Sequence, residues 1–311
     1  MIYFIVNNTA RTGKGRAAWH QIKAVLTERH IDYRAYRTKY PGHATKLARR
    51  ISSLAEDKLY LITVGGDGTL NEVINGITDF QHVILGIIPV GSGNDFARGI
   101  GISKDIQAHL NVMLDLIEND SDGTAIDLGM VSCEALHIPQ YFAISSGVGL
   151  DAIVCKKALH SRLKKFLNQF HLGKLTYLLL TVELLFSMAT CHADITFDHG
   201  EKQHIRHMIF AAAMNLRAEG GGVPMAPDAE PTDGMLCLSI AHDIPKWLTF
   251  FLLPFLVLGK QKYIPAFDCI PFTECTLHLS KPMTVHADGE YGGENLLITY
   301  KCLPGKLHFL K

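Results

Sequence analysis

The chain has 311 residues, enough for two domains that each have a hydrophobic core. Apolar residues make up 48% of the sequence and charged residues 19%, a composition typical of a globular protein rather than a disordered one. The formal net charge is zero, which argues against a protein that holds nucleic acid by attraction to its phosphates.

Cysteines and apolar runs further limit the class of protein. Seven cysteines are scattered without a Cys-x-x-Cys pair, which favours reduced thiols in the cytoplasm over a disulfide framework or a zinc site. Ile2–Val6 already reads as a strand, so we expect no signal peptide. The apolar runs at 175–188 and 247–258 are shorter than the ~20 residues that a membrane-spanning helix needs.

Residues 1 to about 122 alternate between predicted strands and helices. This alternation predicts a parallel sheet with helices on both faces, whose ligands bind at the carboxyl ends of the strands. The glycine-rich turns follow these strands, so they can converge on one site. The predicted strands are Ile2–Val6, 32–37, 59–64 and 83–88, and the predicted helices include 16–29 and 42–54.

Residues 59–76 are predicted to form a buried strand, a glycine loop and a helix. The run 59–64 is apolar and β-branched, as in a strand that is buried on both faces. Gly65, Gly66 and Gly68 follow, and the absence of a Cβ lets the backbone approach a ligand closely.

The start of the helix after this loop predicts an anion site. Thr69 is expected to be the N-cap, with Leu70 on the apolar face. Free N–H groups and the helix dipole at such a start favour a phosphate. Asp67 would repel a bare phosphate, so its presence predicts a divalent metal between the carboxylate and the phosphate.

A second polar turn follows the predicted strand 83–88. The Ser92 hydroxyl can donate to a phosphate, and Arg98 can pair with a carboxylate or a phosphate. Asn94 and Asp95 can orient the reacting groups. As isolated residues they would form a loop and a helix cap, but behind the glycine loop we expect them to line the active site.

Short strands dominate from about residue 123 onward, and they predict an antiparallel β-sandwich or barrel. We therefore predict two domains, an α/β domain at 1–122 and a β-rich domain at 123–311. The predicted strands of the second domain are 125–131, 141–146, Cys191–Phe197, 204–214, 235–241 and several after residue 262.

The loop from Gly65 to Thr69, followed by Asn71 and Glu72, resembles the nucleotide loop of the diacylglycerol kinase and sphingosine kinase superfamily. The first five residues alone are also similar to loops of NAD kinases and phosphofructokinases. The resemblance covers nearly the whole chain with its motifs in the family's order. It implies an N-terminal α/β domain like that of NAD kinase and phosphofructokinase, and an antiparallel β-sandwich after it. It also implies a lipid kinase that uses ATP and Mg²⁺, most simply to convert diacylglycerol to phosphatidic acid.

The resemblance also implies which residues bind the nucleotide. The first loop resembles the opening loop of the lipid kinases, and Thr38 matches a family threonine that contacts the nucleotide. The implied set is Asn7, Thr38, Gly65, Gly66, Asp67, Gly68, Thr69, Leu70, Asn71, Glu72, Ser92, Asn94, Asp95 and Arg98.

A structural magnesium is implied in the second domain. Its expected ligands are the Asp233 carboxylate and the main-chain carbonyls of Glu230 and Met235, an all-oxygen set that suits Mg²⁺. Asp67 is the metal residue expected at the nucleotide loop. Without the resemblance, Asp233 and Gly234 would read as an ordinary turn.

The sequence His286-Ala-Asp-Gly-Glu290 resembles the Asp-Gly-Glu motif of lipid kinases. Phosphoryl transfer to an alcohol needs a carboxylate that orients the hydroxyl and accepts its proton. Asp288 is our first choice for this catalytic role and Glu290 the second. The alternative is a hairpin turn, which Asp-Gly often forms.

Two features bear on membrane contact. The segment 156–165 is basic, and it is either a solvated helix face or a surface attracted to a membrane. Trp19 and Trp247 are expected to pack in the cores.

The expected partner is a lipid substrate at a membrane surface, and no nucleic-acid partner is expected. The protein is expected to be cytoplasmic and to associate peripherally with the membrane. A homodimer is left open.

Three other functions fit parts of the sequence. One is a kinase of another lipid alcohol, such as a sphingoid base or phosphatidylglycerol. A second is an NAD kinase, against which the long lipid-kinase-like C-terminal half argues. The third is a non-catalytic nucleotide or lipid sensor, which the carboxylates at Asp67, Asp95, Asp288 and Glu290 disfavour, because a binding module needs no base.

Overall fold

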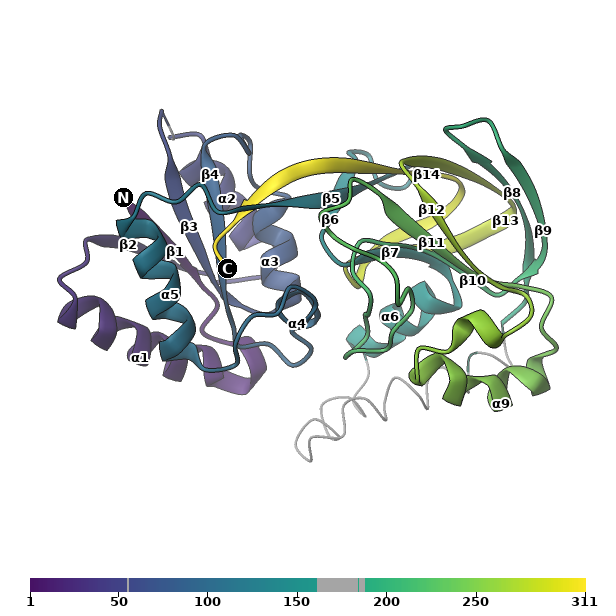
Figure 1. Ribbon diagram of the computed structural model, residues 1–311, viewed down its shortest axis with the longest axis horizontal. Coiled ribbons are helices and arrows are strands. Elements are labelled where there is room, and N and C mark those ends of the chain that lie inside the picture. The colour runs from purple at the N-terminus through teal and green to yellow at the C-terminus, as the bar shows by residue number, and fades with distance from the viewer. Residues whose placement is uncertain (55, 161–183, 185–187) are drawn as a thin grey trace. The chain divides into compact units, whose positions relative to one another are not determined.

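The computed structural model describes the whole chain except residues 55, 161–183 and 185–187 (Figure 1). The chain forms two compact units, which we call unit 1 (Met1–Ile126 with Gly305–Lys311) and unit 2 (Asp127–Pro304). The predicted ranges, 1–122 and 123–311, therefore need correction at the C-terminus. The last residues return to unit 1 because the end of the final strand pairs with a strand of that unit.

Unit 1 contains a parallel sheet in the order β4-β3-β1-β2, and residues 308–309 of β14 add to its β4 edge. The predicted strands are present, with ends within one residue of those expected. The elements are β1 (Ile2–Val6), η1 (Ala10–Gly13), α1 (Lys14–Glu28), β2 (Tyr33–Arg37), α2 (His43–Ser52), β3 (Leu59–Gly65), α3 (Asp67–Ile74), β4 (Val83–Pro89), α4 (Asp95–Gly99) and α5 (Ile106–Glu118).

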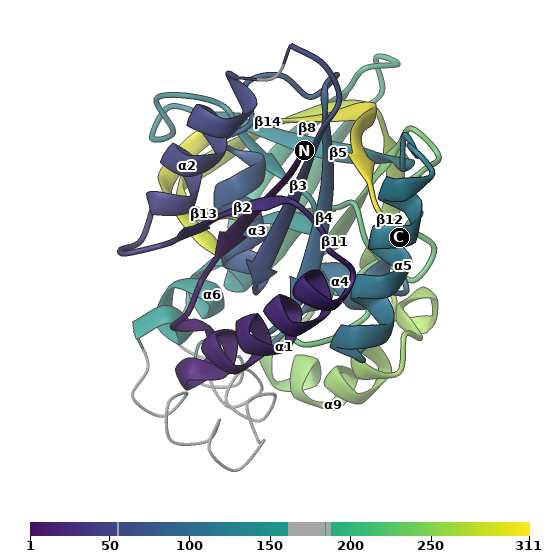
Figure 2. The ribbon, with the colours of Figure 1, turned by 90° about the vertical axis from the view of Figure 1, so that its left-hand side faces the viewer.

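Helices cover both faces of this sheet, as the alternation of elements predicts. Figure 2 shows α2 and α3 on one side and α1 and α5 on the other. The α1 and α5 side has its own core, in which Trp19 packs against the rings of Phe4 and Tyr33. The expectation that Trp19 is a packing residue is therefore confirmed. β1 and β3 are buried along their whole length, which explains their unbroken apolar sequences.

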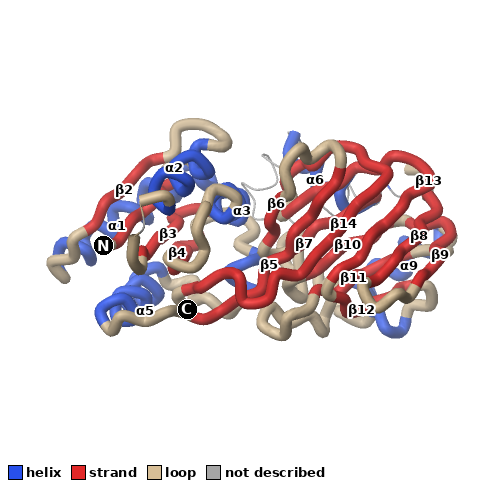
Figure 3. The backbone as a smooth tube through the Cα atoms, turned by 90° about the horizontal axis from the view of Figure 1, so that it is seen from above, coloured by secondary structure: helices blue, strands red, loops and turns tan. Residues whose placement is uncertain are grey.

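Unit 2 is built mainly from antiparallel strands, seen in Figure 3, and the prediction of a β-sandwich is confirmed. One group runs in the order β12-β11-β10-β7, and it meets β13 at the pair Val285 and Val148. The elements are β5 (Thr124–Cys133), β6 (Gln140–Phe142), β7 (Ser145–Gly149), α6 (Leu150–His160), β8 (Cys191–Phe197), β9 (Lys202–Met208), β10 (Phe210–Met214), β11 (Leu236–Ala241), α9 (Lys246–Val257), η2 (Gln261–Tyr263), β12 (Phe267–Phe272), β13 (Glu274–Ala287) and β14 (Glu290–Phe309).

Two predicted strands of unit 2 are each divided in the structure. The run 141–146 contains the end of β6 and the start of β7, and 204–214 contains parts of β9 and β10. Between the last two, the N–H of Ile209 donates to the carbonyl of Ala241, so the chain changes partner there. Among the described residues, no helix is long and apolar enough to cross a membrane. The predicted basic segment lies partly outside the described residues, since 161–165 are not described.

Candidate active site

The glycine loop joins β3 to α3, and the helix begins earlier than predicted. Gly66 is the N-cap and Asp67 the first helical residue, so the predicted N-cap at Thr69 is wrong. Thr69 instead lies inside the helix, and its hydroxyl accepts a hydrogen bond of 3.0 Å from the side-chain amide of Asn7. This bond ties the loop after β1 to the helix after β3.

The turn after β4 packs directly on the glycine loop. The N–H of Val90 donates to the carbonyl of Gly65 over 2.8 Å. A Cβ on Gly66 would lie 2.8 Å from the Cα of Gly91, closer than a real Cβ contact allows. Gly66 is therefore required by contact between two loops of the protein, whereas the sequence suggested only contact with a ligand.

Asp67 and Asp95 lie close together in these loops. The Asp67 carboxylate accepts hydrogen bonds from the N–H groups of Asp95 (3.1 Å) and Phe96 (3.2 Å), so it caps the start of α4. A Cβ built on Gly93 would lie 3.0 Å from an oxygen of Asp67 and 3.1 Å from an oxygen of Asp95. Two carboxylates around one point supply the oxygen ligands that Mg²⁺ prefers, so the residues present fit this ion.

The remaining residues of this turn mostly fix its shape. Asn94 has a left-handed backbone (φ 52°), and its side-chain oxygen accepts from the N–H of Gly91 over 2.8 Å. Arg98 pairs with the Asp95 carboxylate and donates to the carbonyl of Gly93. Ser92 is exposed, so its hydroxyl is accessible to a phosphate.

The first loop lies beside the glycine loop, and the end of β2 lies beside the strand that leads into the first loop. The N–H of Thr38 donates to the carbonyl of Val6, so Thr38 lies next to the strand that leads into Asn7. A hollow of about 410 Å³ opens at the first loop and is lined by Asn8, Thr9, Gly13 and Arg16.

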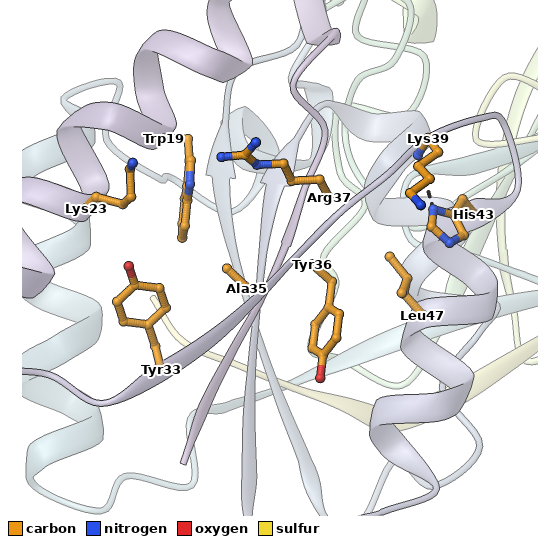
Figure 4. Close-up of a pocket in the computed structure, with 9 residues that line it drawn as sticks. All are labelled: Trp19, Lys23, Tyr33, Ala35, Tyr36, Arg37, Lys39, His43 and Leu47. Carbon is orange, nitrogen blue, oxygen red and sulfur yellow. Dashed lines mark hydrogen bonds between the residues drawn. The ribbon is translucent and has the colours of Figure 1, made fainter.

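A larger hollow of about 620 Å³ lies along β2 (Figure 4). None of its lining residues belongs to the predicted nucleotide-binding set, so we assign it no role in catalysis. They are Trp19, Lys23, Tyr33, Ala35, Tyr36, Arg37, Lys39, His43 and Leu47.

Three predicted nucleotide residues of α3 have structural roles here. Leu70 and Asn71 are buried. The Glu72 carboxylate accepts hydrogen bonds from the N–H groups of Gly42 (2.8 Å) and Ala44 (3.0 Å), so it caps the start of α2. Their contact with a nucleotide stays a prediction.

In unit 2, Asp288 and Gly289 form the two-residue turn between β13 and β14. Both have positive φ, 49° and 85°, as a type I′ hairpin turn requires. The Asp288 carboxylate accepts hydrogen bonds from three backbone N–H groups, those of Ala143 (2.9 Å), Ile144 (2.8 Å) and Ser145 (3.1 Å). These donors occupy the carboxylate oxygens and stabilise their charge, so the geometry does not favour Asp288 as the proton acceptor. Glu290, two residues later, is exposed.

A buried polar group supports this turn. The Nε2 atom of His286 lies 2.5 Å from a carboxylate oxygen of Asp151, and its Nδ1 atom lies 3.1 Å from the backbone nitrogen of Gly289. The hydroxyl of Ser145 donates to the buried Glu219 carboxylate. No role was predicted for Asp151, Glu219 or His286. One sequence signal was the histidine two residues before Asp288.

Burial and mutual charge set the protonation of this group. Burial alone lowers the pKa of His286, but the Asp151 carboxylate raises it, to a net value of about 9. Burial opposes ionisation of Asp151 as well, yet His286 brings the net pKa of Asp151 below its ordinary value. Burial, with the Asp151 charge, raises the pKa of Glu219 well above the ordinary value. The protonated form of Glu219 is therefore favoured over its carboxylate, and His286 and Asp151 form an ion pair.

The predicted metal loop surrounds a second carboxylate that the sequence analysis missed. Asp233 accepts from the N–H of Met235 over 2.9 Å, and the buried Asp127 accepts from the N–H of Gly234 over 2.7 Å. Burial, and then the charges of Asp127 and Asp233, raise the pKa of the Cys302 thiol to about 12. Carboxylates beside main-chain carbonyls fit the implied magnesium. The side chain of Glu230 pairs with Arg217, which leaves its carbonyl as the expected ligand.

Comparison with known proteins gives matches to both units. Residues 1–130 match the model of the diacylglycerol kinase catalytic domain, and residues 144–311 match the YegS C-terminal NAD kinase beta sandwich-like domain. The chain is 30% identical to "Putative lipid kinase YtlR" of Bacillus subtilis (strain 168), over 94% of this chain and 93% of that protein.

It is also 32% identical to the diacylglycerol kinase of the same organism, over 82% of this chain and 78% of that protein. The fold is similar to the crystal structure of a "putative diacylglycerol kinase" from Bacillus anthracis str. Sterne. That match has a TM-score of 0.78 and 21% identity, and covers 99% of this chain and 94% of that one.

Proposed function

The chain belongs to the diacylglycerol kinase family of lipid kinases, and we propose that it transfers the γ-phosphoryl group of ATP to diacylglycerol, giving phosphatidic acid and ADP. The observation that carries the proposal is the approach of Asp67 and Asp95 around Gly93, beside the helix start after the glycine loop. N–H groups at a helix start suit the nucleotide phosphates, and a pair of carboxylates suits their cation.

In this proposal, unit 1 binds the nucleotide. Asp67 and Asp95 hold Mg²⁺, and the exposed Ser92 contacts a phosphate. When bound, Mg²⁺ offsets negative charge on the transferring phosphoryl group. Arg98, which pairs with Asp95, keeps that carboxylate oriented.

The reaction also needs a carboxylate that accepts the proton of the acceptor hydroxyl. The acceptor hydroxyl oxygen attacks the γ-phosphorus, the bond from that phosphorus to the bridging oxygen of ADP breaks, and the hydroxyl proton passes to a carboxylate. We assign this role to Glu290, because it is exposed while three N–H donors hold Asp288. Asp288 then keeps the turn in place. The acceptor is a lipid at a membrane surface.

The test is to incubate the protein with labelled ATP and Mg²⁺, offering acceptors separately in mixed micelles. The acceptors are diacylglycerol, a sphingoid base and phosphatidylglycerol, with NAD in solution as a fourth. We expect label in phosphatidic acid, and loss of that label in Glu290→Gln. The matched control is Glu294→Gln, which removes another exposed carboxylate of β14. Labelling of a different acceptor would replace diacylglycerol, and no labelling of any acceptor would overturn the proposal.

A further inference from the structure

α9 is apolar apart from Lys246 and Thr249, yet one side of it is exposed. Trp247, Phe251 and Phe255 follow each other at four-residue spacing, and their exposed fractions are 63%, 62% and 43%. Residues spaced by four share one face of a helix, so these three rings form a stripe. An all-apolar helix normally lies in a protein core or a membrane. The structure thus corrects the expectation that Trp247 is a packing residue.

The opposite side of the helix holds it in place. Leu256 of the helix packs against the hydrophobic core of unit 2, and so does Ile244, which precedes the helix. Figure 1 shows α9 at the margin of unit 2, beyond the strands of the sandwich. The exposed stripe is therefore presented by an anchored helix rather than by a loose end of the chain.

The exposed apolar surface continues past the end of α9. Leu258 and Tyr263 are exposed, as are the side chains of Lys260 and Lys262. The ammonium of Lys262 lies 5.3 Å from the ring centre of Tyr263. Tryptophan and tyrosine have an apolar body and a polar tip, and lysines attract anionic headgroups, so this set is typical of a bilayer interface. The helix has 12 residues, too few to span a bilayer.

We propose that this surface inserts into the interface of a membrane that contains anionic lipid. We call it the α9 surface, comprising Trp247, Phe251, Phe255, Leu258, Lys260, Lys262 and Tyr263. The proposal rests on the proposed function, because diacylglycerol is confined to bilayers and its kinase must therefore contact a bilayer surface. The apolar rings enter the headgroup and upper acyl region while the lysines stay among the headgroups.

Charge favours a bilayer over a second copy of the chain as the occupant. A symmetric dimer would bring Lys260 and Lys262 of each copy to the same interface, where like charges repel. The nearby acidic residues Asp243 and Asp268 already pair with His242 in the same chain. An anionic lipid surface provides the opposite charge without such pairing.

Tryptophan fluorescence gives a direct test, because the chain has only two tryptophans. Trp19 is 4% exposed in the core of unit 1, and Trp19→Phe leaves Trp247 as the single reporter. The variant is mixed with vesicles of phosphatidylcholine, with or without phosphatidylglycerol, in the absence of ATP and diacylglycerol. We expect a blue shift of the Trp247 emission, and quenching by lipids brominated near the headgroup, most strongly with phosphatidylglycerol present.

Paired variants test which residues bind the vesicles. Phe251→Ser with Phe255→Ser should weaken vesicle binding by roughly tenfold or more, since two rings no longer enter the bilayer. The matched control is Ile138→Ser, which removes another exposed apolar side chain of unit 2 and should bind like the wild type. Lys260→Ala with Lys262→Ala should flatten the fall of binding with added salt. Circular dichroism checks that each variant is folded.

Two outcomes would overturn the proposal. One is Trp247 emission that vesicles leave unchanged. The other is a dimer, seen by light scattering, that dissociates when Phe251 and Phe255 are changed while vesicle binding stays the same. A second copy of the chain would then be the occupant of the α9 surface. The proposed kinase activity and the proposed membrane surface can fail separately. Vesicle binding without phosphorylation of any lipid overturns only the activity, and phosphorylation in micelles without vesicle binding overturns only the membrane surface.

Discussion

The imidazole of His286 lies 2.5 Å from the carboxylate of Asp151, and its side chain is 2% exposed. The other nitrogen of the imidazole lies 3.1 Å from the backbone nitrogen of Gly289, within the turn that precedes Glu290. A buried ion pair thus supports the hairpin on which the proposed proton acceptor lies. Removing one partner of such a pair leaves an uncompensated charge.

This pair makes folding stability depend on pH. The pKa of His286 is raised from 6.5 to about 9 in the folded protein. Because the folded-state pKa is raised, the stabilisation is complete below pH 6.5 and is lost as the pH rises toward 9. We expect the free energy of unfolding of the wild type to fall by up to a few kcal/mol across this window. The fall would be seen as a lower urea concentration at the midpoint of unfolding. His286→Gln should lack this fall. Parallel curves for the two proteins would contradict the ion pair.

The roles of Glu290 and Asp288 can be separated by comparing activity with stability. Glu290→Gln should reduce turnover by roughly 10²-fold or more with unchanged melting temperature and Mg-ATP affinity, the usual scale for a general base. Asp288→Asn should cost about 1–3 kcal/mol of stability, because an amide cannot accept from three N–H donors at once. The measurements are thermal unfolding, ATP calorimetry and lipid phosphorylation. A stable, inactive Asp288→Asn beside an active Glu290→Gln would restore Asp288 as the base.

Asp67 is expected to have two roles, binding the cation through its charge and capping the start of α4. Asp67→Ala should lower stability by about 1 kcal/mol, as the loss of a helix cap does, and should strongly impair the use of Mg-ATP. The control is Asp105→Ala, since Asp105 caps α5 through the N–H groups of Gln107 and Ala108. It should show a similar loss of stability with normal kinetics. If both variants retain wild-type use of ATP, the cation is bound elsewhere.

Chelation tests the metal loop of unit 2. Chelators should lower the melting temperature of the wild type, because an ion bound only by the folded state stabilises it. Asp233→Ala and Asp127→Asn should be insensitive. Glu230→Gln should respond like the wild type, because the expected ligand there is the main-chain carbonyl. An equal response in all four proteins would remove the magnesium assignment.

The sequence by itself determined the layers of both units. Unbroken apolar runs such as Ile2–Val6 and Leu59–Gly65 can be satisfied only by burial on both faces, which parallel strands under helices provide. In unit 2, the short strands separated by turn residues predicted antiparallel pairing. The family motifs pointed to the glycine loop and the Asp-Gly-Glu turn because those residues are contiguous in sequence.

Tertiary structure alone decided what each polar residue does. The Asp67 carboxylate caps a helix that begins 28 residues later, and Asp288 accepts from N–H groups 143 to 145 residues earlier. A carboxylate bonds to whichever donors folding brings within about 3 Å, and a residue pattern does not contain that distance. The same reason applies to α9. Apart from Lys246 and Thr249 the helix is apolar, so its sequence does not mark an outer face, and the exposure of Trp247 followed only from where the core of unit 2 ends.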